Sequence, residues 1–227
     1  MAFLTVAMGL SAVMFASYSI VILRQIYDMY RLRLDYSSIP VKKISALNEK
    51  SGYVRINGKV KPVDIHMKSF IDDLDVSYFR LLAIPQKRAF RPFEKRKAVK
   101  FYISDETGKI LISPEKARFI VNRHSIDGKD VIKNNLSDFL PENFKLENFK
   151  IWEEFLENGS KVNLIGDITV AKEGDFLITK QNKPLVISQC SDDAFMLIHF
   201  RFLMRLIFLF CSMALTSLVQ FYFLFSL

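Results

Sequence analysis

Two uncharged apolar stretches, one at each end of the chain, constrain its fold more than any other feature. Residues 2–23 and residues 206–227 contain no Asp, Glu, Lys or Arg. About 20 apolar residues are enough for a helix to cross the roughly 30 Å of hydrocarbon in a bilayer. The sequence therefore predicts an N-terminal transmembrane helix with an interfacial extension (1–35), a soluble domain (36–193) and a C-terminal transmembrane helix (194–227).

Each stretch has an alternative interpretation. A secretory signal peptide begins with a positively charged region, but no Lys or Arg precedes Arg24. A helix of a soluble protein has a polar face, whereas residues 206–227 carry Phe, Leu and Val on every side and need a larger core than this chain can build. We therefore expect an uncleaved N-terminal anchor and a second membrane span at the C-terminal end.

The cations beside the two stretches predict which side of the membrane holds the middle domain. They lie after the first stretch and before the second, at Arg24, Arg31, Arg33, Lys42, Lys43, Arg201 and Arg205. Short segments rich in Lys and Arg favour the cytosolic side, although long domains follow this rule less strictly. We expect an integral, two-pass membrane protein whose middle domain is cytosolic.

The middle domain has the sequence pattern of a mainly β fold. Alternation at 53–60 predicts a half-buried strand, with Gly58 as a candidate bulge. A hairpin is expected from 98–103 and 109–112, joined by the turn residues SDETG. Further strands are expected at 79–84, 119–123, 161–168, 176–179 and 185–187, and a short helical turn at 152–158. This pattern predicts a small barrel, which can be OB-like, or a sandwich.

Disulfide, metal and cofactor sites are not expected in this chain. It has 2 cysteines and 3 histidines, and these lack the paired spacing of a zinc site: Cys190, Cys211, His66, His124 and His199. No Gly-rich phosphate loop and no nucleophile elbow occurs in the sequence. The residues therefore predict a protein that is not an enzyme.

The densest group of charges is a basic segment interleaved with phenylalanine. Its members are Lys87, Arg88, Phe90, Arg91, Phe93, Lys95, Arg96, Lys97 and Lys100. The net charge of +8 favours an acidic partner, which for a membrane protein means anionic lipid before nucleic acid. Such a segment can lie on lipid headgroups while its aromatic side chains enter the interface. A solvated hairpin loop is the alternative, and nucleic acid is not expected because stacking residues are not evident on adjacent strands.

The order of span, β-rich domain and span resembles the GIDE-type family of membrane-anchored ubiquitin ligases and their prokaryotic relatives. Three stretches carry this resemblance: GYVRINGKV at 52–60, FYISDETGKI at 101–110 and GSKVNLIGD at 159–167. The likeness covers roughly residues 51–188. It implies a membrane-tethered β domain that binds a partner or helps to organise an assembly.

The chain also departs from this family. In the ligases a zinc-binding RING follows the second span and carries the activity, whereas this sequence stops at Leu227 without an array of Cys and His. Ligase activity is therefore assigned to no residue, and a prokaryotic member in the cytoplasmic membrane is expected. The resemblance leaves the orientation open, because the eukaryotic ligases hold the equivalent domain between two mitochondrial membranes.

Two functions follow from these observations. In the first, the protein is a non-enzymatic, membrane-tethered binding or scaffold protein, and its β domain contacts a protein partner or anionic lipid headgroups through the basic segment. Tethering at both ends raises the effective concentration of the domain for membrane-bound partners. In the second, the chain is an accessory subunit of a membrane enzyme or transporter complex and acts through its two helices. A self-contained enzyme is a third alternative.

Overall fold

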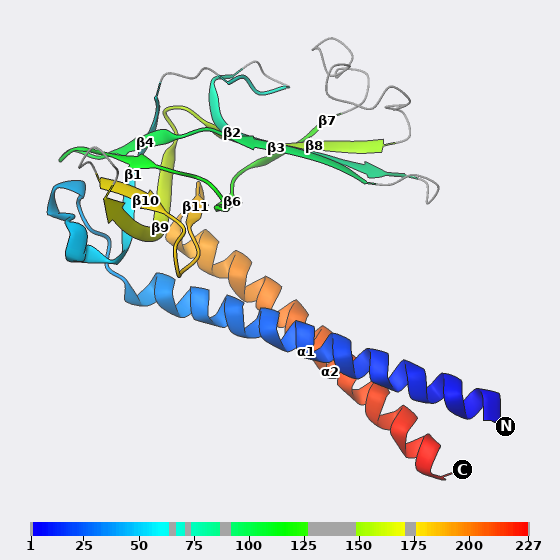
Figure 1. Ribbon diagram of the computed structural model, residues 1–227. Helices are drawn as coiled ribbons and strands as arrows, with labels where there is room; N and C mark the ends of the chain where they lie inside the picture. Colours follow the sequence, from blue (N-terminus) through cyan, green and yellow to red (C-terminus); the bar gives the residue numbers. More distant parts are fainter. Residues whose placement is uncertain are drawn as a thin grey trace. The chain divides into compact units, whose positions relative to one another are not determined.

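The chain divides into a helical unit and a β unit, as the computed structural model in Figure 1 shows. The structure describes residues 2–63, 67–70, 74–86, 92–126, 149–170 and 176–226. The helical unit combines the two ends of the chain, residues 1–38 and 192–227, and the β unit comprises residues 39–191. Each unit has its own internal packing.

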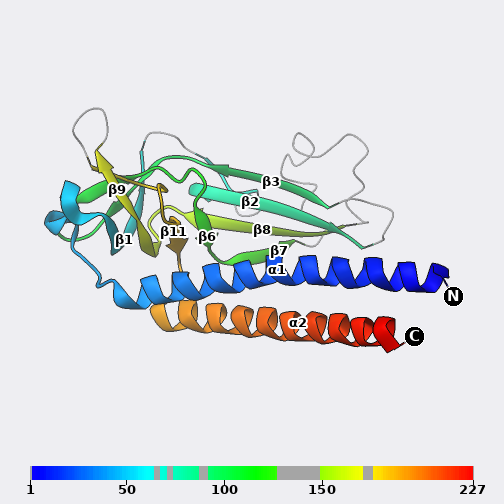
Figure 2. The same cartoon turned by 60° about the horizontal axis from the view of Figure 1, so that its bottom comes forward.

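The helical unit is an antiparallel pair of long helices, α1 (Ala2–Ser38) and α2 (Asp192–Ser226). The two helices run side by side in both views, and both chain ends lie at the same end of the pair (Figures 1 and 2). Apolar side chains hold the pair together along its length, at Ile22, Met29, Leu203 and Leu206. The sequence placed the end of the first helix at about residue 35, and the structure continues it to Ser38, just before Pro40.

Both helices are long and apolar enough to cross a membrane. The segments Gly9–Ser38 and Asp192–Phe223 contain windows with mean hydropathies of 1.4 and 2.1. Many of their large apolar side chains are exposed, with Phe208 at 77% and Tyr222 at 70%. A soluble protein rarely exposes so much contiguous apolar surface, whereas a bilayer covers it.

The β unit is built around a closed barrel of five strands. The strands are β1 (Tyr53–Pro62), β4 (Phe101–Ser104), β5 (Lys109–Ile112), β10 (Phe176–Thr179) and β9 (Lys161–Val170). They pair in the order β1-β4-β5-β10-β9, and β9 pairs with β1 to close the ring. All these pairings are antiparallel except β5 with β10. This is an OB-like barrel, and it confirms the predicted mainly β fold.

The barrel interior is filled by branched aliphatic side chains from alternate strand positions. On β1 these are Val54, Ile56 and Val60, and on β9 they include Val162 and Leu164. The sequence predicted a bulge at Gly58 in strand β1. In the structure the register of β1 with β9 runs without a shift from Tyr53 to Lys59. The prediction of a bulge is therefore wrong.

Gly58 is needed for a different reason, the close approach of β4. A Cβ atom at Gly58 would lie 2.5 Å from Ile103 Cγ2 and 2.6 Å from the backbone oxygen of Ser104. At Lys59 the strand pairs with Ser104 of β4 and with Lys161 of β9, so three strands crowd together there. Glycine is the residue that allows this contact.

A second sheet of four strands branches from the barrel. Its strands are β3 (Phe93–Ala98), β2 (Val76–Pro85), β8 (Phe149–Glu157) and β7 (Arg123–Ile126), in that spatial order (Figure 2). All of its pairings are antiparallel. One face carries a second apolar cluster that includes Phe79, Leu81, Ile151 and Phe155. The strands β2 and β3 lie in sequence between the first two barrel strands, and β7 and β8 lie between the third and fourth.

Residues 152–158 form part of strand β8 and not the helical turn that the sequence predicted. Trp152, Phe155 and Leu156 have helical spacing, but the burial of Ile151, Glu153 and Phe155 follows the alternation of a strand. The alternation is not visible in the sequence because Glu153 occupies a buried position, where a strand pattern is expected to show an apolar residue. In the structure its carboxylate accepts a hydrogen bond of 2.8 Å from the Phe70 N–H.

Short elements complete the β unit and correct two predicted boundaries. The 3₁₀ turns η1 (Ile44–Ala46) and η2 (Glu49–Ser51) precede the barrel, and β11 (Val186–Ser188) pairs in parallel with β6 (Arg118–Ile120). The predicted strand at 98–103 divides between β3 and β4, and the one at 119–123 divides between β6 and β7. Each division marks the point where the chain passes from one sheet to the other.

A basic cleft as the candidate functional site

Five of the predicted contact residues lie on or beside the edge strand β3. Phe93, Lys95, Arg96 and Lys97 belong to the strand, and Lys100 follows it. The other four, Lys87, Arg88, Phe90 and Arg91, lie outside the described residues. Within the described part of the chain, β3 pairs with β2 alone.

The alternation of β3 separates these side chains onto two faces. Phe93 faces the apolar side of the sheet, where it is half-buried against the second core cluster. Arg96 lies on the opposite face, directly across from Arg80 of β2. The phenylalanine therefore contributes to packing, while Arg96, Lys97 and Lys100 are exposed.

A basic cleft of about 220 Å³ lies where the end of β3 meets the turn after β5. We use "basic cleft" for the site formed by Arg96, Lys97, Lys100, Lys116, Tyr78 and Phe119. One carboxylate, Glu115, also lines it. Among the described residues, none of the four cations forms an ion pair. The positive charge of the cleft is thus available to an anion.

Two stacked aromatic rings join the two sheets at the cleft. Tyr78 of β2 and Phe119 of β6 have ring centroids 3.7 Å apart and planes only 6° from parallel. Burial, together with the negative charge of Glu154, raises the pKa of Tyr78 to about 12. The phenol is protonated at neutral pH with or without this shift, so Tyr78 keeps its hydroxyl hydrogen as a donor.

Lys116 reaches the cleft from a turn whose backbone is unusual for its residue type. Its φ is 58°, in the left-handed region that favours glycine or asparagine. The Ala117 N–H donates a hydrogen bond of 3.0 Å to the Pro114 carbonyl and closes the turn. A lysine in this conformation costs about 1 kcal/mol relative to an unstrained position, and such strain is common where side chains hold a ligand.

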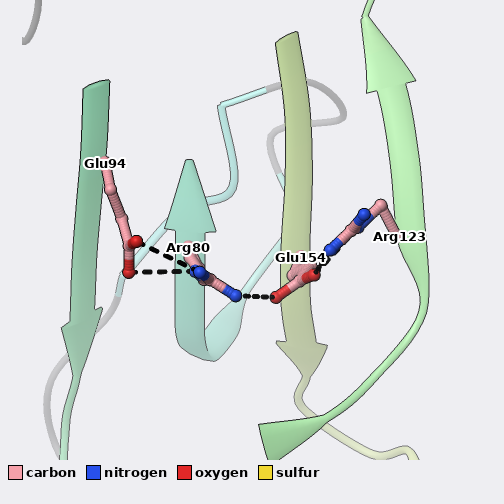
Figure 3. A network of polar contacts seen from close by, with 4 residues as sticks. All are labelled: Arg80, Glu94, Arg123 and Glu154. Carbon is pink, nitrogen blue, oxygen red and sulfur yellow. Dashed lines mark hydrogen bonds and ion pairs between the residues drawn. The ribbon is translucent and has the colours of Figure 1, made fainter. Parts of the chain in front are cut away.

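A ladder of charges crosses all four strands of the second sheet beside the cleft (Figure 3). Arg80 donates two hydrogen bonds to Glu94, of 3.0 and 3.1 Å, and one of 3.3 Å to Glu154. Arg123 donates to the other oxygen of Glu154, with a distance of 2.9 Å from its Nε atom. The two arginines and two glutamates neutralise one another, so the ladder holds the four strands together. It supplies no counter-charge to the four cations of the basic cleft.

The turn and the aromatic pair could not be found from the sequence. Pro114, Glu115 and Lys116 give a recognisable turn signal after the hairpin, but only the fold brings that turn to β3. Tyr78 and Phe119 lie on strands that the sequence predicted without relating them to each other. The arrangement provides cations, a donor hydroxyl and an aromatic surface. The described residues contain no group of three or more metal-ligating side chains.

No family model matches the sequence, and no curated protein matches it either. The resemblance to the GIDE-type family therefore stays a prediction.

Proposed function

We propose that this chain is a membrane-anchored, non-enzymatic binding protein whose β unit binds an acidic protein segment at the basic cleft. The observation that carries the proposal is the convergence of Arg96, Lys97, Lys100 and Lys116, all without an ion pair in the described residues. The cleft lies at the end of an edge strand that bears two of these cations. Electrostatic complementarity of this kind selects partners and speeds their association.

The helices support the membrane anchor of this proposal. Their cations lie in the halves of the helices that join the β unit, at Arg24, Arg31, Arg33, Arg201 and Arg205. By the positive-inside rule the β unit then lies on the cytosolic side. Anchoring at both ends restricts the β unit to a thin layer and raises its effective concentration for partners in the same membrane.

An acidic protein segment fits the site better than a lipid surface. Binding to headgroups was expected to bring phenylalanine into the interface, but Phe93 packs against the second core cluster. Within the described residues β3 has a strand on one side only, and such an edge favours an extended peptide, which adds main-chain hydrogen bonds to the charge contacts. Arg96 and Lys97 are exposed neighbours on β3 and point to opposite faces of the sheet, so carboxylates on a paired strand reach them from both faces.

A peptide of alternating Glu and Thr tests this function, with a Gln and Thr peptide as the uncharged control. Binding to the full chain in phosphatidylcholine nanodiscs is measured by fluorescence anisotropy. We expect the triple variant Arg96→Gln, Lys100→Gln and Lys116→Gln to weaken binding by at least about a hundredfold, since each lost charge contact costs about 1 to 1.5 kcal/mol. Lys50→Gln and Lys180→Gln, which are exposed and lie outside the cleft, should leave binding unchanged.

Two results would contradict this function. The first is equal binding of the charged and uncharged peptides. The second is a triple variant that binds the acidic peptide as strongly as the parent protein does. Loss of peptide binding by the parent in nanodiscs that contain phosphatidylserine would assign the cleft to lipid headgroups.

The helical pair supports the second candidate, an accessory subunit that acts through its helices. Ser11 Oγ donates a hydrogen bond of 3.2 Å to Gln220 Oε1, which joins α1 to α2 within their apolar lengths. Polar groups in a membrane span are often functional. Replacing both helices with unrelated anchors should preserve function if the basic cleft is the working site, and should abolish it if the helices are.

A further inference from the structure

A second polar groove lies on the outer surface of the barrel, where β1, β4 and β9 meet. Its volume is about 790 Å³, and none of its lining residues belongs to the basic cleft. It is lined by lysines, amides, hydroxyls, two carboxylates, Val162, Cys190 and the half-buried Gly58. The stretches NGK at 57–59 and KVN at 161–163 form its floor.

The register of β1 and β9 arranges four side chains at the corners of a rectangle. Asn57 pairs with Asn163, and two residues further on Lys59 pairs with Lys161. Because Ile56, Val60, Val162 and Leu164 point into the barrel, these four side chains share the outer face. Two lysine side chains thus start from directly opposite positions on the two strands, beside two asparagines. Asn163 is held in place by a hydrogen bond of 2.9 Å from its Nδ2 to the Cys190 carbonyl.

The charge of the lysine pair is not balanced within the described residues. Neither Lys59 nor Lys161 forms an ion pair there. Two carboxylates lie at the rim of the groove, but both are engaged elsewhere. Asp105 accepts hydrogen bonds from its own turn and from the Ile44 N–H, and Glu106 pairs with Lys43 at 2.9 Å.

Like charges directly opposite each other destabilise an antiparallel pair, so the lysines gain most from an anion between them. Phosphate fits such a pair, because it accepts charge-assisted hydrogen bonds from several donors. The groove is much larger than one phosphate group, and its remaining lining includes Asn57, Ser104 and Gln189. Amides and hydroxyls suit a hydroxylated group and not an acyl chain.

We propose that this groove binds a phosphate ester whose organic part is hydroxylated, with Lys59 and Lys161 holding the phosphate. A sugar phosphate and a lipid headgroup such as phosphoinositol share this chemistry. Asn57 and Ser104 contact the hydroxyl groups. The proposal is independent of peptide binding at the basic cleft.

Cys190 lines the groove and serves as a reporter of occupancy. In full-length protein carrying Cys211→Ala and held in phosphatidylcholine nanodiscs, a bound ligand should slow the reaction of Cys190 with a membrane-impermeant maleimide. The probes are inorganic phosphate, glycerol 3-phosphate, inositol 1-phosphate, and nanodiscs containing phosphatidylinositol. We expect saturable protection by the esters, and weaker protection by inorganic phosphate because it lacks the hydroxylated part.

Matched variants identify the residues responsible for this protection. The double variant Lys59→Gln and Lys161→Gln should raise the half-protecting concentration by at least about tenfold, since each charge-assisted hydrogen bond contributes that much. The conservative variant Lys59→Arg and Lys161→Arg should retain protection. Lys116→Gln, in the basic cleft, should leave the protection of Cys190 unchanged but should weaken binding of the acidic peptide. Fluorescence of Trp152, the chain's 1 tryptophan, checks that each variant is folded.

The source of the ligand follows from which probe protects. Protection by the free esters indicates a soluble sugar phosphate, and protection only in nanodiscs with phosphatidylinositol indicates a lipid headgroup. The proposal is overturned if no probe protects Cys190 at millimolar concentration. It is equally overturned if the Lys59→Gln and Lys161→Gln double variant is protected as well as the parent.

Discussion

The second sheet and the barrel each place two positively charged residues directly opposite each other, but they differ in whether carboxylates neutralise this charge. In the second sheet Arg80 on β2 faces Arg96 on β3, and in the barrel Lys59 on β1 faces Lys161 on β9. Such pairs destabilise a sheet by up to about 1 kcal/mol. Two carboxylates surround Arg80, whereas within the described residues the two lysines have no ion pair.

The difference separates charges that hold the fold from charges that are available to a ligand. Glu94 and Glu154 bind Arg80 from both sides, so the second sheet neutralises its charge within the protein. The barrel retains an unfavourable lysine pair over a groove. Functional sites often keep such local costs, because residues chosen for binding are seldom the best ones for stability.

We expect the largest loss of unfolding free energy from a substitution that disrupts strand β1, where Lys59 lies opposite Lys161. Gly58→Ala puts a Cβ atom 2.6 Å from the backbone oxygen of Ser104, and a backbone atom cannot rotate away. We expect the variant to lose about 3 kcal/mol of unfolding free energy, the upper range for overpacking. Urea unfolding of the full chain in detergent, followed by Trp152 fluorescence, measures the loss.

Gly166→Ala is the matched control for this prediction. The two nearest atoms to its Cβ atom would be side-chain methyl groups, Ile178 Cγ2 and Leu185 Cδ1, both at 2.7 Å, and the backbone oxygen of Thr179 lies at an ordinary contact distance of 3.6 Å. Because side-chain methyl groups can move, we expect a loss of about 1 kcal/mol. Equal losses for the two variants would show that the approach of β4 is not what requires glycine at position 58.

The next largest loss of stability should come from removing a carboxylate charge from the second sheet, which leaves its arginines without that ion-pair partner. Glu154→Gln keeps the shape of the side chain but removes the charge that Arg80 and Arg123 share. Glu154 is only 14% exposed, so we expect a loss of about 2 kcal/mol, within the range for hydrogen bonds to charged groups. Glu94→Gln, at 44% exposure, should cost less than half as much. Equal stability of Glu154→Gln and the parent would contradict a structural role for the ladder.

The pKa of Tyr78 gives a second measurement on the same variant. Burial raises this pKa first, and the Glu154 charge raises it further. Removing that charge should therefore lower the Tyr78 pKa from about 12, which ultraviolet titration detects. A change in stability without any change in this titration would mean that the charge of Glu154 is not felt at the basic cleft.

The sequence predicts the parts of the fold that repeat a simple period. Strands such as β1 and β9 were predicted because their apolar residues alternate, and both long helices because they are continuously apolar. Strand β8 was missed because the buried Glu153 interrupts its apolar alternation. The splits at 99–100 and 121–122 were missed because a passage between sheets depends on tertiary pairing, which no local pattern records.

The candidate site was predictable only where its residues are neighbours in sequence. Arg96, Lys97 and Lys100 form one basic segment and could be selected by their charge alone. Lys116 and Phe119 reach the same cleft from beyond the following hairpin, and the inserted strands bring them there. The lysine pair of the barrel was hidden for the same reason, because Lys59 and Lys161 are far apart in sequence and meet only through the register of β1 with β9.

A smaller effect is expected when the barrel receives the carboxylate that it lacks. Lys161→Glu places an opposite charge across from Lys59, which should replace repulsion with attraction and raise the unfolding free energy by about 0.5 kcal/mol. Lys161→Gln should give about half of this gain, because it removes the repulsion alone. Urea unfolding at low salt measures both. A loss of stability in Lys161→Gln would show that the lysine pair is stabilising without a ligand.

The smallest effect is a pH dependence at Asp105, the carboxylate at the rim of the barrel groove. Desolvation raises its pKa, but hydrogen bonds from the Thr107 hydroxyl and from the N–H groups of Ile44, Thr107 and Gly108 outweigh it and lower the pKa. An aspartate with a lowered folded pKa stabilises the protein fully above its unfolded pKa of about 3.9. That contribution is lost as the pH falls through the folded pKa. The stability advantage of the parent over Asp105→Asn should therefore shrink as the pH is lowered from about 5 to about 2.5.

Thr107→Val sharpens this test, because it removes the hydroxyl that is the largest of the hydrogen-bond contributions to the Asp105 pKa. The folded pKa then rises toward its unfolded value, so the variant should lose its pH-dependent stability at a higher pH than the parent. Unfolding curves at a series of pH values follow both changes. If the parent and Asp105→Asn keep a constant difference in stability over this range, the ionisation of Asp105 does not contribute to the stability of the fold.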